Sequence, residues 1–196
     1  SAQFRAKGCG SVGIRKGVSA MNPAEWNYLD RETLLAHAYA IEHEAAERYP
    51  DLAAQMHDSN HVEVGGLFAK LAEVEAKHAA ELSLEHGAAV TPAGGSEFMW
   101  DSLESPLESP EAIAYGDMHY LMTPRHALTL ALAAEQRALS FYEDLAARAP
   151  SEDLRVLAAE FAAEEAEHVR MVQEWLQRLP EDEADWDDDM DPPVEV

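Results

Sequence analysis

Apolar positions recur every three or four residues along four long stretches of the chain, which is the pattern of amphipathic helices. The first stretch begins near Asp30, and the second covers residues 62–86. The third and fourth begin near residues 123 and 151. Proline lacks the backbone donor of a helix interior, so we expect Pro50 to kink or end the first helix. Few β-branched runs interrupt these stretches, and the pattern therefore predicts an all-α protein.

The spacing of the stretches predicts how the helices connect. The first pair and the last pair are each separated by a few residues, which favours two antiparallel hairpins. Residues 88–122 contain Pro and Ser and are too long for a tight turn, so we interpret them as a crossover along a four-helix bundle. The halves also repeat: Tyr-Pro-Asp-Leu-Ala-Ala from Tyr49 matches Tyr-Glu-Asp-Leu-Ala-Ala from Tyr142.

The ends of the chain differ in composition from the helical part. Residues 1–22 are Gly-rich and basic, and residues 181–196 are rich in Asp and Glu. Segments of that kind bury little apolar surface, so we expect a flexible N-terminal extension and a disordered acidic tail. The predicted domain is then residues 23–180.

Charge and cysteine content exclude several classes of function. The formal net charge is −24, with only 14 Lys and Arg, whereas binding to nucleic acid requires clustered basic residues. The same charge argues against anionic membrane surfaces, and no apolar stretch is long enough to span a bilayer. Cys9 is the single cysteine, so neither an internal disulfide nor a Cys-x-x-Cys metal site is expected. Without a secretory signal pattern, we expect a cytoplasmic location.

Each predicted helix carries one Glu inside its apolar stripe, and two helices add a His three residues later. Residues three apart share a helix face, with Cβ atoms about 5–6 Å apart, so a carboxylate and an imidazole can serve the same metal. A lone Glu in a stripe usually extends to solvent, and a lone His is usually a hydrogen-bonded core residue. Four carboxylates converging without cations would be costly, however. The predicted metal ligands are Glu42, Glu75, His78, Glu135, Glu165 and His168.

Two tyrosines follow the glutamates of the first and third helices by two helical turns. Tyr49 and Tyr142 would either hydrogen-bond the ligand carboxylates and take part in redox chemistry, or pack as ordinary aromatic residues. Three further histidines, His37, His43 and His61, are interpreted as surface or capping residues.

The ligand pattern resembles that of the ferritin-like di-iron carboxylate proteins. Among them the chain is most similar to the rubrerythrin family, over roughly residues 30–179. The resemblance rests on three segments: Ala-Tyr-Ala-Ile-Glu-His-Glu-Ala-Ala-Glu-Arg-Tyr ending at Tyr49, Glu-Ala-Lys-His-Ala from Glu75, and Glu-Ala-Glu-His from Glu165. It implies a ferritin-like bundle with two iron ions, although manganese or a mixed pair would also suit carboxylate and imidazole ligands.

The chain departs from that family in two places. Typical rubrerythrins carry a rubredoxin domain with four cysteines, which this sequence lacks. Many also have a further Glu where Ala138 stands, so the expected ligand set is closer to that of bacterioferritin. Bacterioferritin binds haem through a Met at the position of Ala76, and we therefore expect no haem by that route.

The resemblance implies a redox enzyme that reduces hydrogen peroxide or oxygen with electrons from a separate donor protein. Glu42 and Glu135 would be terminal ligands, Glu75 and Glu165 would bridge, and each histidine would bind one iron. A homo-oligomer is expected, with a dimer favoured. The alternative is a ferroxidase that handles iron for storage or detoxification, and a third interpretation is a metal-bound structural module.

Overall fold

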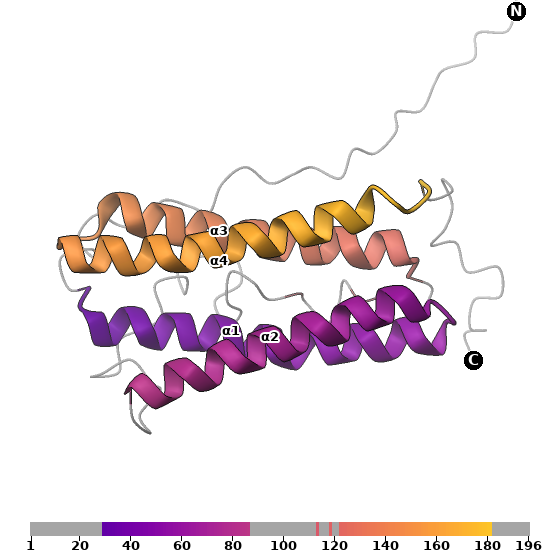
Figure 1. Ribbon diagram of the computed structural model, residues 1–196, viewed down its shortest axis with the longest axis horizontal. Helices are drawn as coiled ribbons and strands as arrows, with labels where there is room; N and C mark the ends of the chain where they lie inside the picture. The colour runs from indigo at the N-terminus through magenta and orange to yellow at the C-terminus, as the bar shows by residue number, and fades with distance from the viewer. Residues whose placement is uncertain (1–28, 87–112, 114–117, 119–121, 182–196) are drawn as a thin grey trace, which may run out of the picture.

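The computed structural model describes residues 29–86, 113, 118 and 122–181 (Figure 1). This part of the chain forms four helices and no strands, so the predicted all-α class is confirmed. The expected N-terminal extension, most of the crossover and nearly all of the acidic tail lie outside the described residues. The helices are α1 (Arg31–Asp58), α2 (Val62–His86), α3 (Pro124–Arg148) and α4 (Glu152–Leu176).

Three helices begin with a side-chain cap. The side chains of Asp30, Thr123 and Ser151 each accept a hydrogen bond from the backbone N–H three residues later, at 2.8, 3.0 and 3.3 Å. Such caps satisfy one of the donors that a helix start leaves unpaired. α1 does not end at Pro50 but continues to Asp58, because the proline lies on the exposed side while Tyr49 and Leu52 beside it are buried in the core.

A tight turn joins α1 to α2. Asn60 adopts a positive φ of 63°, a conformation that Asn tolerates better than most residues. In the first turn of α2, Gly65 lies against the His57 side chain, and a Cβ there would come within 2.9 Å of the ring. The glycine therefore permits the close approach of the two helices beside their turn.

The bundle consists of two helical hairpins. α1 packs along α2 and α3 packs along α4, and Figure 1 shows the two pairs as two layers. Between the layers, the most extensive backbone contact is between α1 and α3. The predicted hairpin architecture is confirmed.

The apolar core is divided into two clusters along the bundle. One contains Ile41, Leu82, Ala138 and Phe161, and the other contains Ala45, Leu71, Ala134 and Val172, among others. On each helix, the predicted metal-ligating glutamate lies between the residue named from one cluster and the residue named from the other. The sequence therefore places a polar layer across the middle of the bundle, with apolar packing on both sides.

Candidate metal centre

The polar layer brings together all six residues predicted from the sequence. The four glutamates are at most 2% exposed, although each carries a carboxyl group. One comes from each helix, and the imidazoles of His78 and His168 come from α2 and α4. Their rings are nearly parallel, with an interplanar angle of 11° and centroids 5.9 Å apart.

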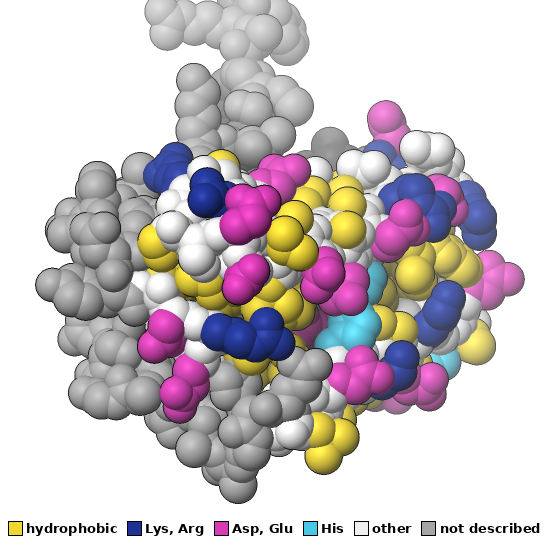
Figure 2. Space-filling model, turned by 60° about the vertical axis from the view of Figure 1, so that its left-hand side comes forward, with side chains coloured by type: hydrophobic (Ala, Val, Ile, Leu, Met, Phe, Trp, Pro, Cys, Tyr) yellow, Lys and Arg dark blue, Asp and Glu magenta, His cyan; other side chains and the backbone are white. Residues whose placement is uncertain are grey.

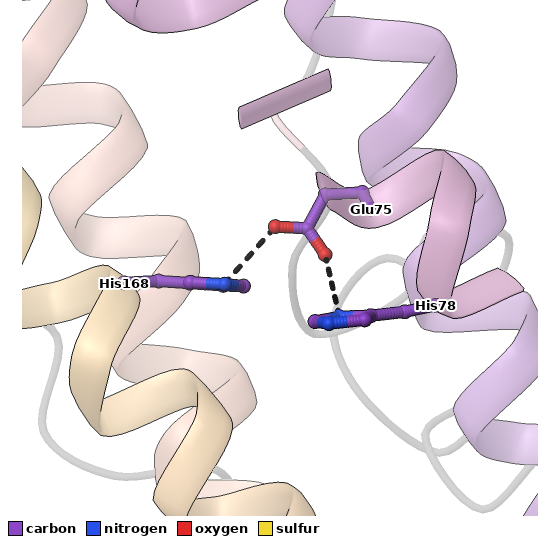
Figure 3. Close-up of side chains that lie close together, drawn as sticks. All are labelled: Glu75, His78 and His168. Atoms are coloured by element: carbon purple, nitrogen blue, oxygen red, sulfur yellow. Dashed lines mark ion pairs between the residues drawn. The ribbon is translucent and has the colours of Figure 1, made fainter. Parts of the chain in front are cut away.

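Glu75 lies between the two imidazoles (Figure 3). Its Oε1 is 3.0 Å from Nδ1 of His168, and its Oε2 is 3.7 Å from Nδ1 of His78. The same His78 nitrogen is 3.3 Å from Oε2 of Glu42. Glu75 thus connects the two hairpins, which is the geometry expected of a carboxylate that bridges two ions.

The other half of the layer is built by α3 and α4. Nδ1 of His168 lies 3.4 Å from Oε2 of Glu135 and 3.6 Å from Oε2 of Glu165. Ligand atoms of two groups of three lie within 4.8 Å of one another, close enough to hold one ion each. These groups are Glu75, His78 and His168, and Glu135, Glu165 and His168.

Burial and mutual interaction shift the pKa values of the charged groups in this layer. Burial raises the pKa of Glu75 to about 8 and that of Glu165 well above its usual value. The adjacent carboxylates of Glu42 and Glu75 raise the pKa of His78 to about 10. For His168, burial is the largest influence and lowers the pKa, but the surrounding glutamates outweigh it and bring the value to about 11.

Several buried polar atoms of this layer have no hydrogen-bond partner. Each of the six residues has at least one buried polar atom with no hydrogen-bond partner, and Glu75 has two. Within the part of the chain that the structure describes, no Lys or Arg forms an ion pair with these glutamates. Buried anionic oxygens normally have partners, and cations would supply them here. Carboxylates and imidazoles without thiolates are a donor set that suits iron or manganese.

Tyr49 connects the layer to the core beside it. Its hydroxyl donates a hydrogen bond to Oε1 of Glu135, which joins α1 to α3. Its ring stacks on Phe68 with centroids 5.9 Å apart. Tyr142, equivalent in the repeat, is fully buried and packs against the rings of Phe141 and Phe161, with centroids 5.4 and 5.2 Å away.

Comparisons with known proteins agree with this geometry. A family model described as Rubrerythrin matches residues 126–193. A solved structure of an uncharacterized conserved protein from Magnetospirillum magnetotacticum is 34% identical, with a TM-score of 0.65. The match covers 79% of this chain and 99% of that one. The chain belongs to the rubrerythrin-like group of ferritin-like proteins. No curated protein matches it.

For this rubrerythrin-like chain, Ala138 has a structural consequence. It is fully buried one helical turn after Glu135, so α3 offers a methyl group and no second carboxylate at this position. The centre accordingly contains four glutamates and two histidines. Along the described helices, we find no segment long and apolar enough to cross a membrane.

The two imidazoles of the rubrerythrin-like centre differ in their exposure. The side chain of His78 is 19% exposed, whereas that of His168 is 6% exposed. Figure 2 shows imidazole surface on one face of the molecule, among carboxylate side chains. His78 is therefore the more solvent-exposed of the two candidate ligand imidazoles.

Two features of this region were not predicted from the sequence. His37 was interpreted as a surface or capping residue, but it is buried, with Nδ1 2.6 Å from the Thr33 carbonyl oxygen and its ring stacked on Phe141. Glu164 lies next to a ligand on α4 and interacts electrostatically with His78. Since the sequence contains many exposed glutamates, nothing in the helical pattern distinguishes Glu164 from the others.

Proposed function

We propose that this protein is a non-haem di-iron redox enzyme that reduces hydrogen peroxide, or oxygen, with electrons from a separate donor. The observation that supports the proposal most is the set of unpartnered buried atoms on six converging residues. Membership of the rubrerythrin-like group supports the same chemistry.

In this proposal both hairpins contribute ligands to the pair of metal ions. Glu42 and His78 would hold one metal ion, and Glu135, Glu165 and His168 would hold the other. Glu75, whose two oxygens face different imidazoles, would be available to both, whereas Glu165, also expected to bridge, approaches only His168. When bound, a pair of ferrous ions supplies two electrons together, which is what cleavage of a peroxide O–O bond requires.

The rest of the chain prepares the site for that reaction. The apolar clusters on both sides place the glutamates of the layer in a low-dielectric surrounding, which strengthens electrostatic interactions there. Among the residues that the structure describes, no Lys or Arg pairs with these carboxylates, so they are available to balance the charge of bound cations. Tyr49 holds one oxygen of Glu135 through its hydroxyl proton, so it limits how that carboxylate can turn.

A ferroxidase is the second candidate, and Ala138 favours it. The missing third-helix carboxylate leaves a more symmetrical set of ligands, as in a site that takes up ferrous iron as a substrate and oxidises it. Oligomeric state would help to separate the two functions, because storage needs a hollow shell of many subunits. We propose a dimer for the peroxide-reducing enzyme.

The two functions can be compared directly by stopped-flow spectroscopy. The protein is loaded anaerobically with ferrous iron and mixed with peroxide or oxygen at equal concentration. We expect faster oxidation by peroxide, and no rapid phase in a Glu75→Ala variant. Oxidation by oxygen at an equal or higher rate would assign the protein to the ferroxidase or oxidase class.

A further inference from the structure

A recess open to solvent lies beside the C-terminal part of α1. Its volume is about 480 Å³, and it is lined by Asp51, Ala54, Gln55, Asp58, Ser59 and Met118. Most of the lining residues from α1 and the turn after it are exposed. Asp51 follows the candidate ligand Glu42 by nine residues, which corresponds to roughly 13 Å along a helix axis. The recess is therefore separate from the candidate metal centre.

Met118 differs from the other lining residues because it comes from the segment between the two hairpins. Its side chain is partly buried and packs against the apolar cluster that contains Met56, Ile113 and Met122. Those three residues are at most 3% exposed. Met118 therefore contacts both the core and the recess, whereas Met56 and Met122 are enclosed in the core.

Apolar packing holds the described residues of that segment on the bundle. Ile113 and Met122 are buried in the cluster, and Met118 packs against it from the recess side. Among these three residues, Met118 alone is not fully buried. A chemical change at its thioether would thus act where the segment meets both solvent and α1.

The Met118 thioether can be oxidised by hydrogen peroxide that enters the recess. A sulfur lone pair attacks one peroxide oxygen, the O–O bond breaks and an S–O bond forms. The proton on the transferred oxygen passes to the departing hydroxide, which leaves as water. Methionine is thereby oxidised by two electrons to its sulfoxide, and the peroxide is reduced. Side chains of Asp51, Gln55 and Asp58 offer hydrogen-bond partners to peroxide in the recess.

We propose that Met118 is a reversible oxidation site for hydrogen peroxide, and that its sulfoxide loosens the segment between the hairpins from the bundle. The sulfoxide is polar, and burying a polar group without a partner is unfavourable. The oxidised side chain therefore leaves the cluster for the recess and water. Methionine sulfoxide reductases reverse the change. The site does not depend on the metal centre, because peroxide attacks the sulfur directly.

Peptide mass spectrometry after peroxide treatment tests where oxidation occurs. The purified full-length protein is treated with hydrogen peroxide in the presence of a chelator that removes free iron from solution, and samples are quenched over time. We expect the peptide containing Met118 to gain one oxygen about threefold faster or more than those containing Met56 and Met122, because exposure governs the rate. This measurement needs no variant.

Thermal melts before and after treatment test the structural consequence. Oxidation should lower the Tm of the wild type by about 2–4 °C, and treatment with both methionine sulfoxide reductases should restore it. Met118→Leu keeps an apolar side chain of similar volume and should resist the fall. Met171→Leu is the matched control, because Met171 is also partly buried against the same cluster but does not line the recess. It should lose stability as the wild type does.

Two outcomes would overturn the proposal. Oxidation of Met56 or Met122 at the rate of Met118 would show that the recess gives Met118 no special access to peroxide. A Met118→Leu variant that loses as much Tm as the wild type would place the sensitive group elsewhere. Neither result bears on the metal content of the protein, so the proposed function is tested separately.

Discussion

The two Glu-x-x-His pairs have the same spacing but different environments. The pair on α2 is called the open half of the centre, because the side chain of His78 is 19% exposed. The pair on α4 is called the closed half, because that of His168 is 6% exposed, and both glutamates are buried. His168 is near three glutamates, and His78 is near two. Two copies of one motif thus differ in how far their histidines are exposed and in how many glutamates surround them.

This difference teaches that Glu75 is not simply the counterpart of Glu165. Within the layer, Glu75 lies within 4 Å of both imidazoles, whereas Glu165 lies that close only to His168. Removing Glu75 should therefore affect both halves, while changes at His78 should affect mainly the open half. Variants of these residues can test whether changes at Glu75 have the larger effect.

The largest effect is expected from Glu75→Ala. Because this carboxylate lies between the imidazoles, its loss should reduce bound metal from two ions per chain to one or fewer. Glu75→Gln keeps the side-chain volume and should show the same loss. Metal analysis after gel filtration measures it, with Glu73→Ala on the exposed side of α2 as the matched control. Full occupancy in both Glu75 variants would remove this residue from the ligand set.

Metal removal should lower stability and make it depend on pH. A ligand at 100 times its Kd stabilises the folded state by about 2.7 kcal/mol. In the metal-free protein, the folded-state pKa values of Glu75, His78 and His168 are all raised, to about 8, 10 and 11. The folded chain then binds more protons than the unfolded chain.

Stability of the metal-free protein should consequently fall as pH rises. The contribution of Glu75 is present below its unfolded value near 4.5 and is lost towards about 8. That of the histidines is present below 6.5 and is lost as pH approaches about 10 and 11. Thermal melts across this range, with and without metal, check the trend. A metal-free Tm that rises with pH would contradict it.

A moderate effect on metal content is expected from replacing either histidine, and its rescue should differ between the open and closed halves. His78→Gly and His168→Gly should each lose metal, but added imidazole should restore binding mainly in His78→Gly, because that side chain is partly exposed. Metal content measured with and without imidazole gives the comparison. Equal rescue of the two variants would mean that the closed half is as accessible as the open one.

The smallest effect is expected from Tyr49→Phe. It removes the hydroxyl that hydrogen-bonds Glu135 and leaves the ring packed on Phe68. Loss of a buried hydrogen bond to a charged group costs about 1.5–3 kcal/mol. Denaturant unfolding of the metal-free protein measures this cost, with metal content expected to stay at the wild-type value. Unchanged stability would show that the hydrogen bond contributes little.

Much of the fold could be predicted from the sequence, because helix caps and apolar periodicity are local signals. The helix starts predicted near residues 30, 123 and 151 are confirmed, and Asp30, Thr123 and Ser151 are the caps there. Of the two effects expected at Pro50, an end of the first helix is wrong, since α1 continues through it with buried residues on both sides. Tertiary packing of this kind cannot be predicted from local sequence patterns.

The candidate centre was predicted as a set of residues but not as an arrangement. Spacing places a glutamate and a histidine on one helix face, yet it cannot show that Glu75 lies between the imidazoles. The unequal exposure of His78 and His168 depends on the packing of whole helices, which the repeated spacing does not show. The burial of His37 also depends on packing between helices, against Phe141 of α3.

The central claim is that the buried layer holds two metal ions between the hairpins. An anaerobic titration of metal-free protein with ferrous iron, followed by Mössbauer spectroscopy of the bound iron after oxidation, tests it most directly. We predict saturation at two ions per chain and an antiferromagnetically coupled pair, as expected for ions that share Glu75. Saturation at one ion, or two magnetically isolated ions, would contradict the account.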